Sequence, residues 1–320
     1  MALKKYEIGY AMGLKNKFVV GLPADKRGIC AVVTTFQPSA DLVANIKLIV
    51  GQVARVIIVD DSGTAEGWQR LRLWFRDMRT VEILSQPYNL GQATALNCGI
   101  AAAQSRGYQW ILTLDDDTSV ESDLVGNLIR SWNTLSGDGG KPVAVIGASH
   151  RDGSTGCIEA HAENDRWFLE KRGIITAGSL FPVAVYQEIG PFRDEFFIDS
   201  VDYDFCLRAR AAGYRVVKLS RVGMTHSIGS RTRHHLGCLT VETTNHTPVR
   251  RYYMYRNSLV LALEYLFRDP LFSFAVVFFN FKTLVLVLVF EEYRARKVGM
   301  MWRGTIDALA HRMGKLQSGT

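Results

Sequence analysis

Apolar runs of strand length alternate with amphipathic segments from residue 28 to residue 115. Four runs have strand length: Ile29–Thr34, Val56–Val59, Val81–Leu84 and Trp110–Leu114. Between the runs, apolar residues recur at helical spacing over 42–50, 68–78 and 91–104. Strands that alternate with helices predict an α/β protein with a Rossmann-like, mostly parallel sheet and helices on both faces.

The pattern is less regular between residues 143 and 219. It predicts a strand at Val143–Gly147, loops or short strands over 150–167, an apolar stretch at Ile174–Ser179, a helix at Asp202–Ala212 and a strand at Tyr214–Leu219. Gly213 follows the predicted helix directly and is suited to ending it.

The character of the chain changes after about residue 250. Tyr252–Phe267 is amphipathic to apolar, Pro270 interrupts it, and Leu271–Phe290 then has the length of a membrane-spanning helix. Lys282 near its middle would cost roughly 2.5–3.5 kcal/mol in a bilayer. We therefore favour a helix that lies on or dips into the inner leaflet. The alternatives are a buried helical hairpin or dimer interface, and a true spanning helix.

These shifts predict three regions. Residues 1–27 form an N-terminal extension with a short strand at Lys17–Val20, residues 28–250 form the α/β domain, and residues 251–320 form a C-terminal helical, membrane-associated region. Because no long apolar run follows the first residues, we expect no secretory signal.

Composition narrows the classes of partner. The 320 residues are 48% hydrophobic and carry a net charge of +7, with much of the excess after residue 210. Anionic membrane and phosphorylated substrates fit this charge. Nucleic acid does not, because the chain has neither zinc-finger spacing nor an RNA-binding aromatic signature. The five cysteines form no CxxC pair, which fits a reducing cytoplasm.

Polar clusters follow three of the predicted strands. They are Thr34-Thr35, Asp60-Asp61 and Asp115-Asp116-Asp117, and on a parallel sheet such strand ends form the ligand-binding edge. Three adjacent carboxylates repel one another unless a cation offsets them, and Mg²⁺ and Mn²⁺ prefer oxygen ligands. The alternative is a solvated acidic loop in which Asp117 or Ser119 caps the next helix.

Several motifs together resemble one known family. They are Ala31-Val32-Val33-Thr34-Thr35-Phe36, Val59-Asp60-Asp61-Ser62, Asn89–Asn97, Leu114–Asp117 and Phe197–Arg208. In this order the chain resembles a family 2 inverting glycosyltransferase with the GT-A fold, from the branch of bacterial rhamnosyltransferases and galactofuranosyltransferases. The resemblance covers about residues 28–257.

The resemblance implies which residues hold a nucleotide sugar: Thr34, Thr35, Phe36, Asp60, Asp61, Asn89, Gly91, Asn97, Asp115 and Asp116. A carboxylate suits the imide N–H of uracil or thymine, although Asp61 would also suit a helix cap. Asn97 either contacts the nucleotide or braces its helix.

The resemblance also implies a base and a metal site. Asp202 matches the general base, with Asp199 and Asp204 as rivals. An i,i+4 ion pair between Asp204 and Arg208 favours a structural or acceptor-binding role for both. The family often has Glu-Asp where this chain has Val201-Asp202, which leaves one acceptor contact in doubt. Asp115, Asp117 and His226 match the metal ligands, and a mixed oxygen–nitrogen site favours Mn²⁺ somewhat over Mg²⁺.

Basic residues follow His226 in the sequence. The diphosphate candidates are Arg231, Arg233, Arg250 and Arg251, in a region that forms a mobile loop in the family. An arginine there would bind phosphate through two parallel hydrogen bonds, whereas the alternative is a solvated basic loop that faces lipid. The QxxRW motif of processive synthases is absent from the sequence, which favours the transfer of one or few sugars.

We therefore expect a metal-dependent, inverting glycosyltransferase at the cytoplasmic face of a bacterial inner membrane. It would move L-rhamnose from dTDP-rhamnose to a lipid-linked saccharide in O-antigen or capsule synthesis. UDP-galactofuranose is the alternative donor. A nucleotidyltransferase would need a glycine-rich phosphate loop after its first strand, and a non-catalytic membrane scaffold would have little use for Asp202 and His226. A homo-oligomer is compatible with the sequence.

Overall fold

A computed structural model describes residues 26–153, 155–158, 166–226, 232–236 and 239–317. The strand expected at Lys17–Val20 and the candidate Arg231 lie outside these residues.

The first half of the chain has the expected alternation of strands and helices. Its elements are a 3₁₀ turn at Lys26–Gly28, β1 (Ile29–Thr35), α1 (Asp41–Ile49), β2 (Arg55–Asp60), α2 (Ala65–Phe75), β3 (Val81–Ser85), α3 (Gln92–Ser105), β4 (Trp110–Asp115), β5 (Ser119–Val120) and α4 (Leu124–Ser136). All four expected strands and all three expected helices of this half are therefore confirmed.

The second half adds short strands and the C-terminal helices. Its elements are β6 (Val143–Asp152), β7 (Phe168–Glu170), β8 (Ser179–Pro182), α5 (Val183–Ile189), the 3₁₀ turn η3 (Asp194–Phe196), α6 (Val201–Ala211), β9 (Arg215–His226), β10 (Thr232–Leu236), β11 (Leu239–Thr243), α7 (Pro248–Tyr265), α8 (Pro270–Phe290) and α9 (Arg294–Leu309). The apolar stretch Ile174–Ser179 is mostly irregular and reaches β8 only at Ser179.

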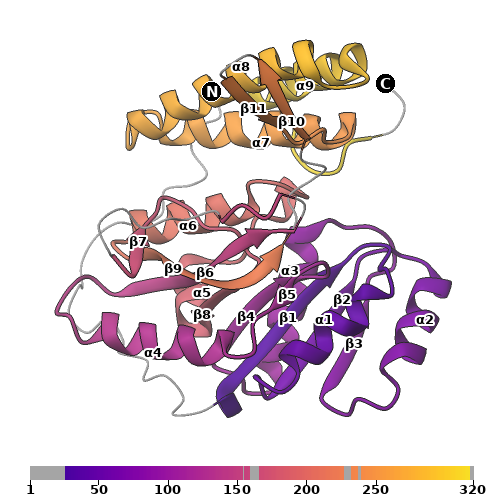
Figure 1. Ribbon diagram of the computed structural model, residues 1–320, viewed down its shortest axis with the longest axis vertical. Helices are drawn as coiled ribbons and strands as arrows, with labels where there is room; N and C mark the ends of the chain where they lie inside the picture. Colours follow the sequence, from indigo (N-terminus) through magenta and orange to yellow (C-terminus); the bar gives the residue numbers. More distant parts are fainter. Residues whose placement is uncertain (1–25, 154, 159–165, 227–231, 237–238, 318–320) are drawn as a thin grey trace.

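One nine-stranded sheet, in the order β3-β2-β1-β4-β8-β6-β9-β5 with β7 paired to β9, forms the centre of the molecule (Figure 1). The first four strands are parallel, and β8 pairs antiparallel with both β4 and β6. In register, Thr34 lies beside Asp115, and Thr35 lies beside Asp60. The three polar clusters therefore share one edge of the sheet, as the sequence predicts.

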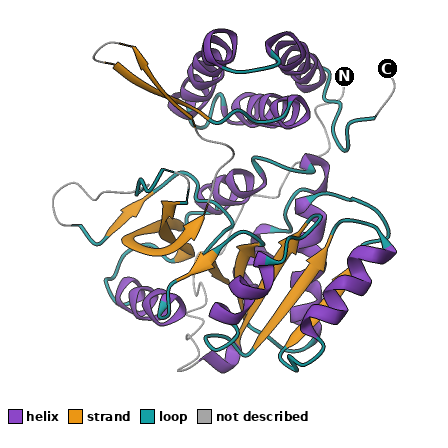
Figure 2. Ribbon diagram, turned by 45° about the vertical axis from the view of Figure 1, so that its right-hand side comes forward, coloured by secondary structure: helices purple, strands orange, loops and turns teal. Residues whose placement is uncertain are grey.

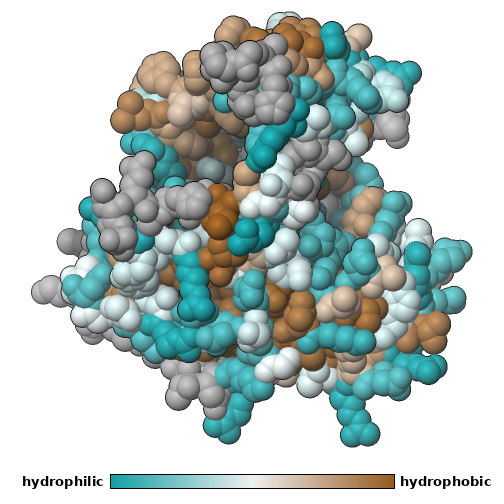
Figure 3. Space-filling model, in the orientation of Figure 1, coloured by the Kyte–Doolittle hydropathy of each residue, from teal (hydrophilic) through white to brown (hydrophobic). Residues whose placement is uncertain are grey.

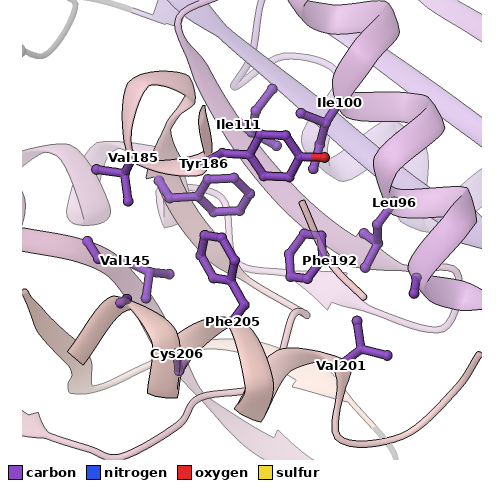
Figure 4. Packing of buried hydrophobic residues seen from close by; sticks show 14 of the residues in the cluster. Leu96, Ile100, Ile111, Val145, Val185, Tyr186, Phe192, Val201, Phe205 and Cys206 are labelled. Atoms are coloured by element: carbon purple, nitrogen blue, oxygen red, sulfur yellow. The ribbon is translucent and has the colours of Figure 1, made fainter. Parts of the chain in front are cut away.

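Apolar side chains cover both faces of this sheet. Alternate residues of β1 point to opposite faces, so Cys30 and Val32 pack with α3, whereas Ile29 and Ala31 pack with α1, α2 and α4. Under α6, the Phe192 and Phe205 rings lie 4.9 Å apart between Tyr186 and Val201, and Figure 4 shows these rings converging. The core thereby anchors α6 to the sheet.

Local capping explains where several helices begin. The Thr64 side chain accepts a hydrogen bond from the Gly67 N–H at the start of α2, and Thr247 accepts one from the Arg250 N–H at the start of α7. Asp269 does the same for α8, and prolines occupy the first position of α7 and α8, where the missing N–H costs nothing.

The helices α7, α8 and α9 form a separate layer above the strand ends (Figures 1 and 2). Gly304 of α9 lies against α7 so closely that a Cβ would come within 2.5 Å of the Tyr252 carbonyl oxygen. A buried charge network of Arg251, Glu291 and Lys297 also joins the layer. The division expected at residue 250 falls inside the first turn of α7, which begins at Pro248.

Helix α8 turns a largely apolar face outward. Its buried side chains are Phe272, Ser273, Thr283 and Val287, whereas Leu271, Phe274, Val277, Phe278, Phe279, Phe281, Val285, Leu288 and Val289 are exposed. Among the described residues, this is the one helix long and apolar enough to cross a membrane by length and composition. Figure 3 shows apolar surface on the helical layer at the top.

Candidate functional site

A cleft of about 580 Å³ lies between the polar strand ends and the helices α6 and α7. From the sheet it is lined by Thr34, Thr35, Phe36, Asp61, Asn89, Gly91, Gln92, Asp115, Asp116, Asp117, Thr176 and His226. From the opposite side it is lined by Phe197, Asp199, Ser200, Asp202, Thr247, Val249, Arg250 and Tyr253. The structure therefore brings most of the candidate residues into one cleft.

Asp115, Asp117 and His226 form a compact cluster in this cleft, with one potential ligand atom of each within 4.8 Å of the others. The short pairing of β5 with β9 places the turn after β4 beside the end of β9, which carries His226. His226 Nδ1 lies 2.9 Å from an Asp117 oxygen, and its Nε2 lies 3.8 Å from an Asp115 oxygen. Two carboxylates and an imidazole are a donor set that fits a divalent transition-metal ion.

The electrostatics of this cluster reflect its burial. Burial raises the pKa of Asp115 to about 6, although the nearby His226 acts in the opposite direction. Burial lowers the pKa of His226, but the hydrogen bond to Asp117 and the charge of Asp115 raise it more. A bound cation would offset the electrostatic repulsion between the carboxylates. The alternative in which Asp117 or Ser119 caps a helix is wrong, because Ser119 starts β5 and Asp123 precedes α4.

Asp116, the middle carboxylate, faces β1 as well as the cleft. Its side chain accepts a 2.6 Å hydrogen bond from the Thr35 hydroxyl. Its backbone carbonyl accepts another from the Asn45 amide at 2.9 Å. Asp116 therefore fixes the acidic turn to β1 and α1 instead of joining the three-ligand cluster.

Asp61 shapes the part of the cleft beside the Asn89–Gly91 turn. Its carboxylate accepts hydrogen bonds from the backbone N–H groups of Leu90 and Gly91, at 2.7 and 2.8 Å. Gly91 has φ +96°, and a Cβ there would lie 2.5 Å from the Phe197 carbonyl oxygen. Only glycine allows this close approach without strain. The helix-cap alternative for Asp61 is wrong, because Thr64 caps α2.

Two of the expected nucleotide-binding residues do not line the cleft. Asp60 is fully buried, and one of its oxygens accepts the Ser62 N–H. The Asn97 amide donates to the Phe192 carbonyl and to Asp194, and its oxygen accepts from the Tyr186 hydroxyl. Asn97 braces α3 against the segment before α6, so the bracing alternative is the one that the structure shows.

The turn before Asp202 is held in an unusual conformation. Phe197, Asp199 and Ser200 all have positive φ, between 62° and 65°, a region that non-glycine residues rarely adopt. The Asn257 side chain of α7 donates to the carbonyl groups of Phe196, Ile198 and Asp199, at 2.8–2.9 Å. One amide of the helical layer thus fixes the loop that leads into α6.

Among the described residues, Asp202 is the one of the three candidate bases that has no arginine partner. The Tyr203 N–H donates to its carboxylate at 2.8 Å, and burial raises its pKa to about 7. Asp199 pairs with Arg250 at 3.2 Å. Asp204 is buried and pairs with Arg208 at 2.7 Å, so the expected i,i+4 ion pair is present and lies outside the cleft.

Of the diphosphate candidates, Arg250 alone among the described residues lines the cleft. Arg233 lies on the β10–β11 ribbon and pairs with Glu242 at 2.8 Å. Arg251 is buried against Glu291. The expectation was therefore too broad for Arg233, which the β10–β11 ribbon carries. It was also too broad for Arg251, because adjacent residues of a helix, such as Arg250 and Arg251, point in different directions.

The segment after α9 also contributes to the cleft, although it was not among the expected site residues. Lys315 Nζ donates to the Asn89 carbonyl at 2.8 Å, and the Leu316 N–H donates to the Tyr253 hydroxyl at 2.7 Å. Tyr253 stacks on Phe197 with ring centroids 5.0 Å apart. No motif marks Lys315, since a lone lysine near a chain end carries no pattern.

Comparison with known proteins identifies the family of this chain. Residues 30–189 match the model of glycosyl transferase family 2. The chain belongs to this family. The glycosyltransferase is also 26% identical over 245 residues to the dTDP-rhamnosyl transferase RfbF of Shigella flexneri, covering 73% of this chain and 79% of RfbF.

Solved structures show the same fold at low sequence identity. Residues 1–349 of TarS from S. aureus, in complex with UDP-GlcNAc, give a TM-score of 0.58 at 14% identity, over 88% of this chain and 81% of TarS 1–349. The mannosyltransferase PcManGT from Pyrobaculum calidifontis, in complex with GDP-Man and Mn²⁺, gives 0.56 at 12% identity, over 90% and 89% of the two chains. The glycosyltransferase therefore has the predicted GT-A fold.

Proposed function

We propose that this glycosyltransferase moves L-rhamnose from dTDP-rhamnose to a saccharide linked to a lipid, with inversion at the anomeric carbon. The arrangement that carries the proposal is a single cleft with Asp202 on one wall and the Asp115–Asp117–His226 cluster on the other. The likeness to the RfbF transferase supports the choice of donor.

Asp202 is suited to the proton transfer that inversion requires. A base must remove the proton of the acceptor hydroxyl as that oxygen attacks the anomeric carbon from the face opposite the leaving group. A carboxylate with a pKa of about 7 is basic enough to accept the proton of the acceptor hydroxyl. At a pH slightly above 7 it is still largely ionised and therefore ready to accept that proton. In the proposed mechanism the carboxylate of Asp202, which lines the cleft, accepts this proton.

The other wall is suited to the leaving nucleoside diphosphate. Asp115, Asp117 and His226 would hold Mn²⁺ or Mg²⁺, which when bound stabilises the developing diphosphate charge. Arg250 would donate to phosphate oxygens. It pairs with Asp199 at 3.2 Å, which keeps its guanidinium at the cleft.

Asp61 and the Asn89–Gly91 turn would bind the nucleoside. The Asp61 carboxylate lies in the cleft and could accept the imide N–H of thymine. Uracil presents the same donor, so Asp61 does not separate dTDP-rhamnose from UDP-galactofuranose. The family membership favours a glycosyltransferase over a nucleotidyltransferase or a non-catalytic scaffold.

The exposed face of α8 would place the enzyme on the cytoplasmic face of the inner membrane. Nine large apolar side chains of α8 are exposed, and Arg294 and Arg296 follow the helix. Apolar burial and basic charge together favour an anionic membrane surface. The lipid of the acceptor would lie in the same surface, which fits a role in cell-surface polysaccharide assembly.

Calorimetry with a panel of nucleotide sugars tests the proposal. We expect metal-dependent binding of dTDP-rhamnose and slow release of dTDP, both lost in Asp117→Ala. Selective binding of UDP-galactofuranose would leave the proposed mechanism unchanged and would make UDP-galactofuranose the donor instead of dTDP-rhamnose. No metal-dependent binding of any nucleotide sugar would overturn the proposal.

A further inference from the structure

Two adjoining hollows lie outside the donor cleft, where α6 meets the turn between α7 and α8. One is lined by Leu207, Ala211, Tyr265, Arg268 and Asp269. The other is lined by Glu170, Lys171, Arg172, Gly173, Tyr203 and Phe272. Arg210 lines both, and we call the two together the basic groove.

Positive charge dominates this groove. Its two carboxylates are already paired, Asp269 with Arg172 at 2.7 Å and Glu170 with Arg215 at 2.8 Å. Within the described parts of the chain, the structure shows no carboxylate at ion-pair distance from Lys171, Arg210 or Arg268, although Arg210, after Arg172, also contributes to lowering the pKa of Asp269. Arg210 donates instead to the Lys171 carbonyl at 3.2 Å. Three cations without an ion pair of their own, near a carboxylate that Arg172 already neutralises, favour an anionic ligand.

Apolar side chains border the groove at the start of α8. Phe267 is 95% exposed, and Leu271 and Phe274 are 73% and 67% exposed. Phe267 and Leu271 flank Arg268 and Asp269, which line the groove. A ligand that carries an anion next to a long apolar chain would complement both features.

The first turn of α6 connects the groove to the reacting centre. Asp202 lines the donor cleft, whereas its neighbour Tyr203 lines the groove and is 41% exposed. Gly173 packs against the Tyr203 ring, where a Cβ would come within 2.7 Å. Ile175 and Thr176, two and three residues further along, line the donor cleft. A single molecule could therefore reach from the groove to Asp202.

We propose that Lys171, Arg210 and Arg268 bind the phosphate group that joins the lipid to the saccharide of the acceptor. The apolar chain would lie along Phe267, Leu271 and Phe274, and the saccharide would extend past Tyr203 to Asp202. This inference rests on the proposed function for its acceptor class. It assigns a binding site to residues outside the donor cleft.

Direct binding of farnesyl diphosphate to the full chain in mild detergent tests the proposal. Farnesol, which lacks the phosphates, is the ligand control, and chelator keeps the metal cluster from binding the diphosphate. We expect the double variant Arg210→Gln, Arg268→Gln to weaken farnesyl diphosphate binding about tenfold or more, because each arginine provides charge-assisted hydrogen bonds. Farnesol binding should stay unchanged, and Arg210→Lys, Arg268→Lys should recover part of the loss.

Arg76→Gln is the matched control variant. Arg76 follows α2, is exposed, and pairs with its neighbour Asp77 at 3.3 Å. Equal weakening in Arg76→Gln and in either single variant, Arg210→Gln or Arg268→Gln, would overturn the proposal, because the effect would then come from net charge. Displacement of farnesyl diphosphate by excess dTDP would also overturn it, since the ligand would occupy the donor cleft.

Vesicles of phosphatidylglycerol and of phosphatidylcholine separate the acceptor phosphate from a membrane headgroup. If the double variant loses vesicle binding but keeps farnesyl diphosphate binding, the groove binds headgroups and the proposal is wrong. Release of dTDP from dTDP-rhamnose, measured alongside, reports on the donor cleft. If that release is absent while farnesyl diphosphate binding still depends on the arginines, the donor assignment fails and the groove stands.

Discussion

His226 Nδ1 lies 2.9 Å from an Asp117 carboxylate oxygen, although one residue ends β9 and the other follows β4. The pair exists because β5 joins β9 through Ser119 and Thr225. An imidazole that is to ligate a metal ion must first lose its proton on the ligating nitrogen. Because Asp117 and Asp115 raise the pKa of His226, metal binding should release protons and strengthen with rising pH.

The first prediction concerns the metal ion. His226→Ala and Asp117→Ala should each weaken Mn²⁺ binding by more than the roughly 10–100-fold that loss of an outer hydrogen-bond partner costs. Calorimetry at pH 7.5 without nucleotide sugar measures this. Asp77→Ala, which removes an exposed carboxylate beside Arg76, is the control. Unchanged Mn²⁺ affinity in both cluster variants would show that the ion binds elsewhere.

Asp202→Asn should reduce sugar transfer by about 10²–10⁴-fold, the usual contribution of a general base. In the wild-type protein, kcat/KM should rise with pH through about 7, where Asp202 loses its proton. Initial rates between pH 5.5 and 9 check both statements. A wild-type profile that is flat across this range would assign the proton transfer to another group.

The same substitution should stabilise the fold at alkaline pH. Burial raises the folded-state pKa of Asp202. Its contribution to the free energy of unfolding is therefore fully present at acid pH and is lost as the pH rises through about 7. Asparagine carries no charge and keeps an acceptor for the Tyr203 N–H. Melting temperatures should be higher for the variant at pH 8, with the difference shrinking toward pH 4.

Asn257→Ala should loosen the turn that leads into α6. The variant leaves the partly buried carbonyls of Ile198 and Asp199 without this donor, at a cost of about 1–3 kcal/mol for unsatisfied groups. The Phe196 carbonyl still accepts from the Ile198 N–H and from Arg256. Thermal unfolding should report the loss, and kcat should fall while binding of dTDP stays close to normal. Ser258→Ala, at the next position of α7, is the control, because its hydroxyl bonds to Tyr255 and Asn280 and not to the turn before Asp202.

Lys315→Met tests the segment after α9. Its hydrogen bond to the Asn89 carbonyl holds the turn that lines the nucleoside end of the cleft. A net contribution of about 1 kcal/mol corresponds to roughly a fivefold rise in KM for the donor, with kcat nearly unchanged. Arginine at this position should restore KM, and Lys47→Met on α1 should have no effect. If kcat and the melting temperature both fall while KM for the donor stays unchanged, the role of Lys315 is structural only.

Phe274→Glu and Phe278→Glu together should abolish binding to vesicles that contain phosphatidylglycerol. Both phenyl rings are more than two-thirds exposed on α8, and a charge on a membrane-facing surface is costly to bury. Sedimentation with vesicles measures the change. Leu73→Glu on α2, at a site that is 61% exposed, is the control. Undiminished sedimentation would favour a dimer interface on α8.

The sequence predicts the first half of the fold well because its periodicity is local. Buried parallel strands and the helices between them each leave a pattern of 4 to 14 residues, and β1 to β4 follow that pattern. The pairing of β8 between β4 and β6 leaves no such trace, because the β4–β8 pairs join residues 66 to 72 positions apart and the β6–β8 pairs join residues 32 to 34 positions apart.

The candidate site divides in the same way. Residues at strand ends, such as Asp61 and Asp115, are found because the sheet fixes where they lie. Asn97 and Arg251 have the right residue type but point to structural partners, and their direction depends on tertiary packing. Lys315 was missed because it reaches Asn89 across 226 positions of sequence.

The hydrogen bonds from Asn257 to the turn before Asp202 have a practical consequence for producing this enzyme. A shortened form that ends before α7 would remove the apolar surface of α8 and would be easier to keep in solution. It would also remove the amide that keeps Phe197, Asp199 and Ser200 at positive φ. Such a form would also lack Arg250 and Lys315, so it should bind nucleotide more weakly and fail to transfer sugar. Solubility is better sought by changing individual exposed side chains of α8.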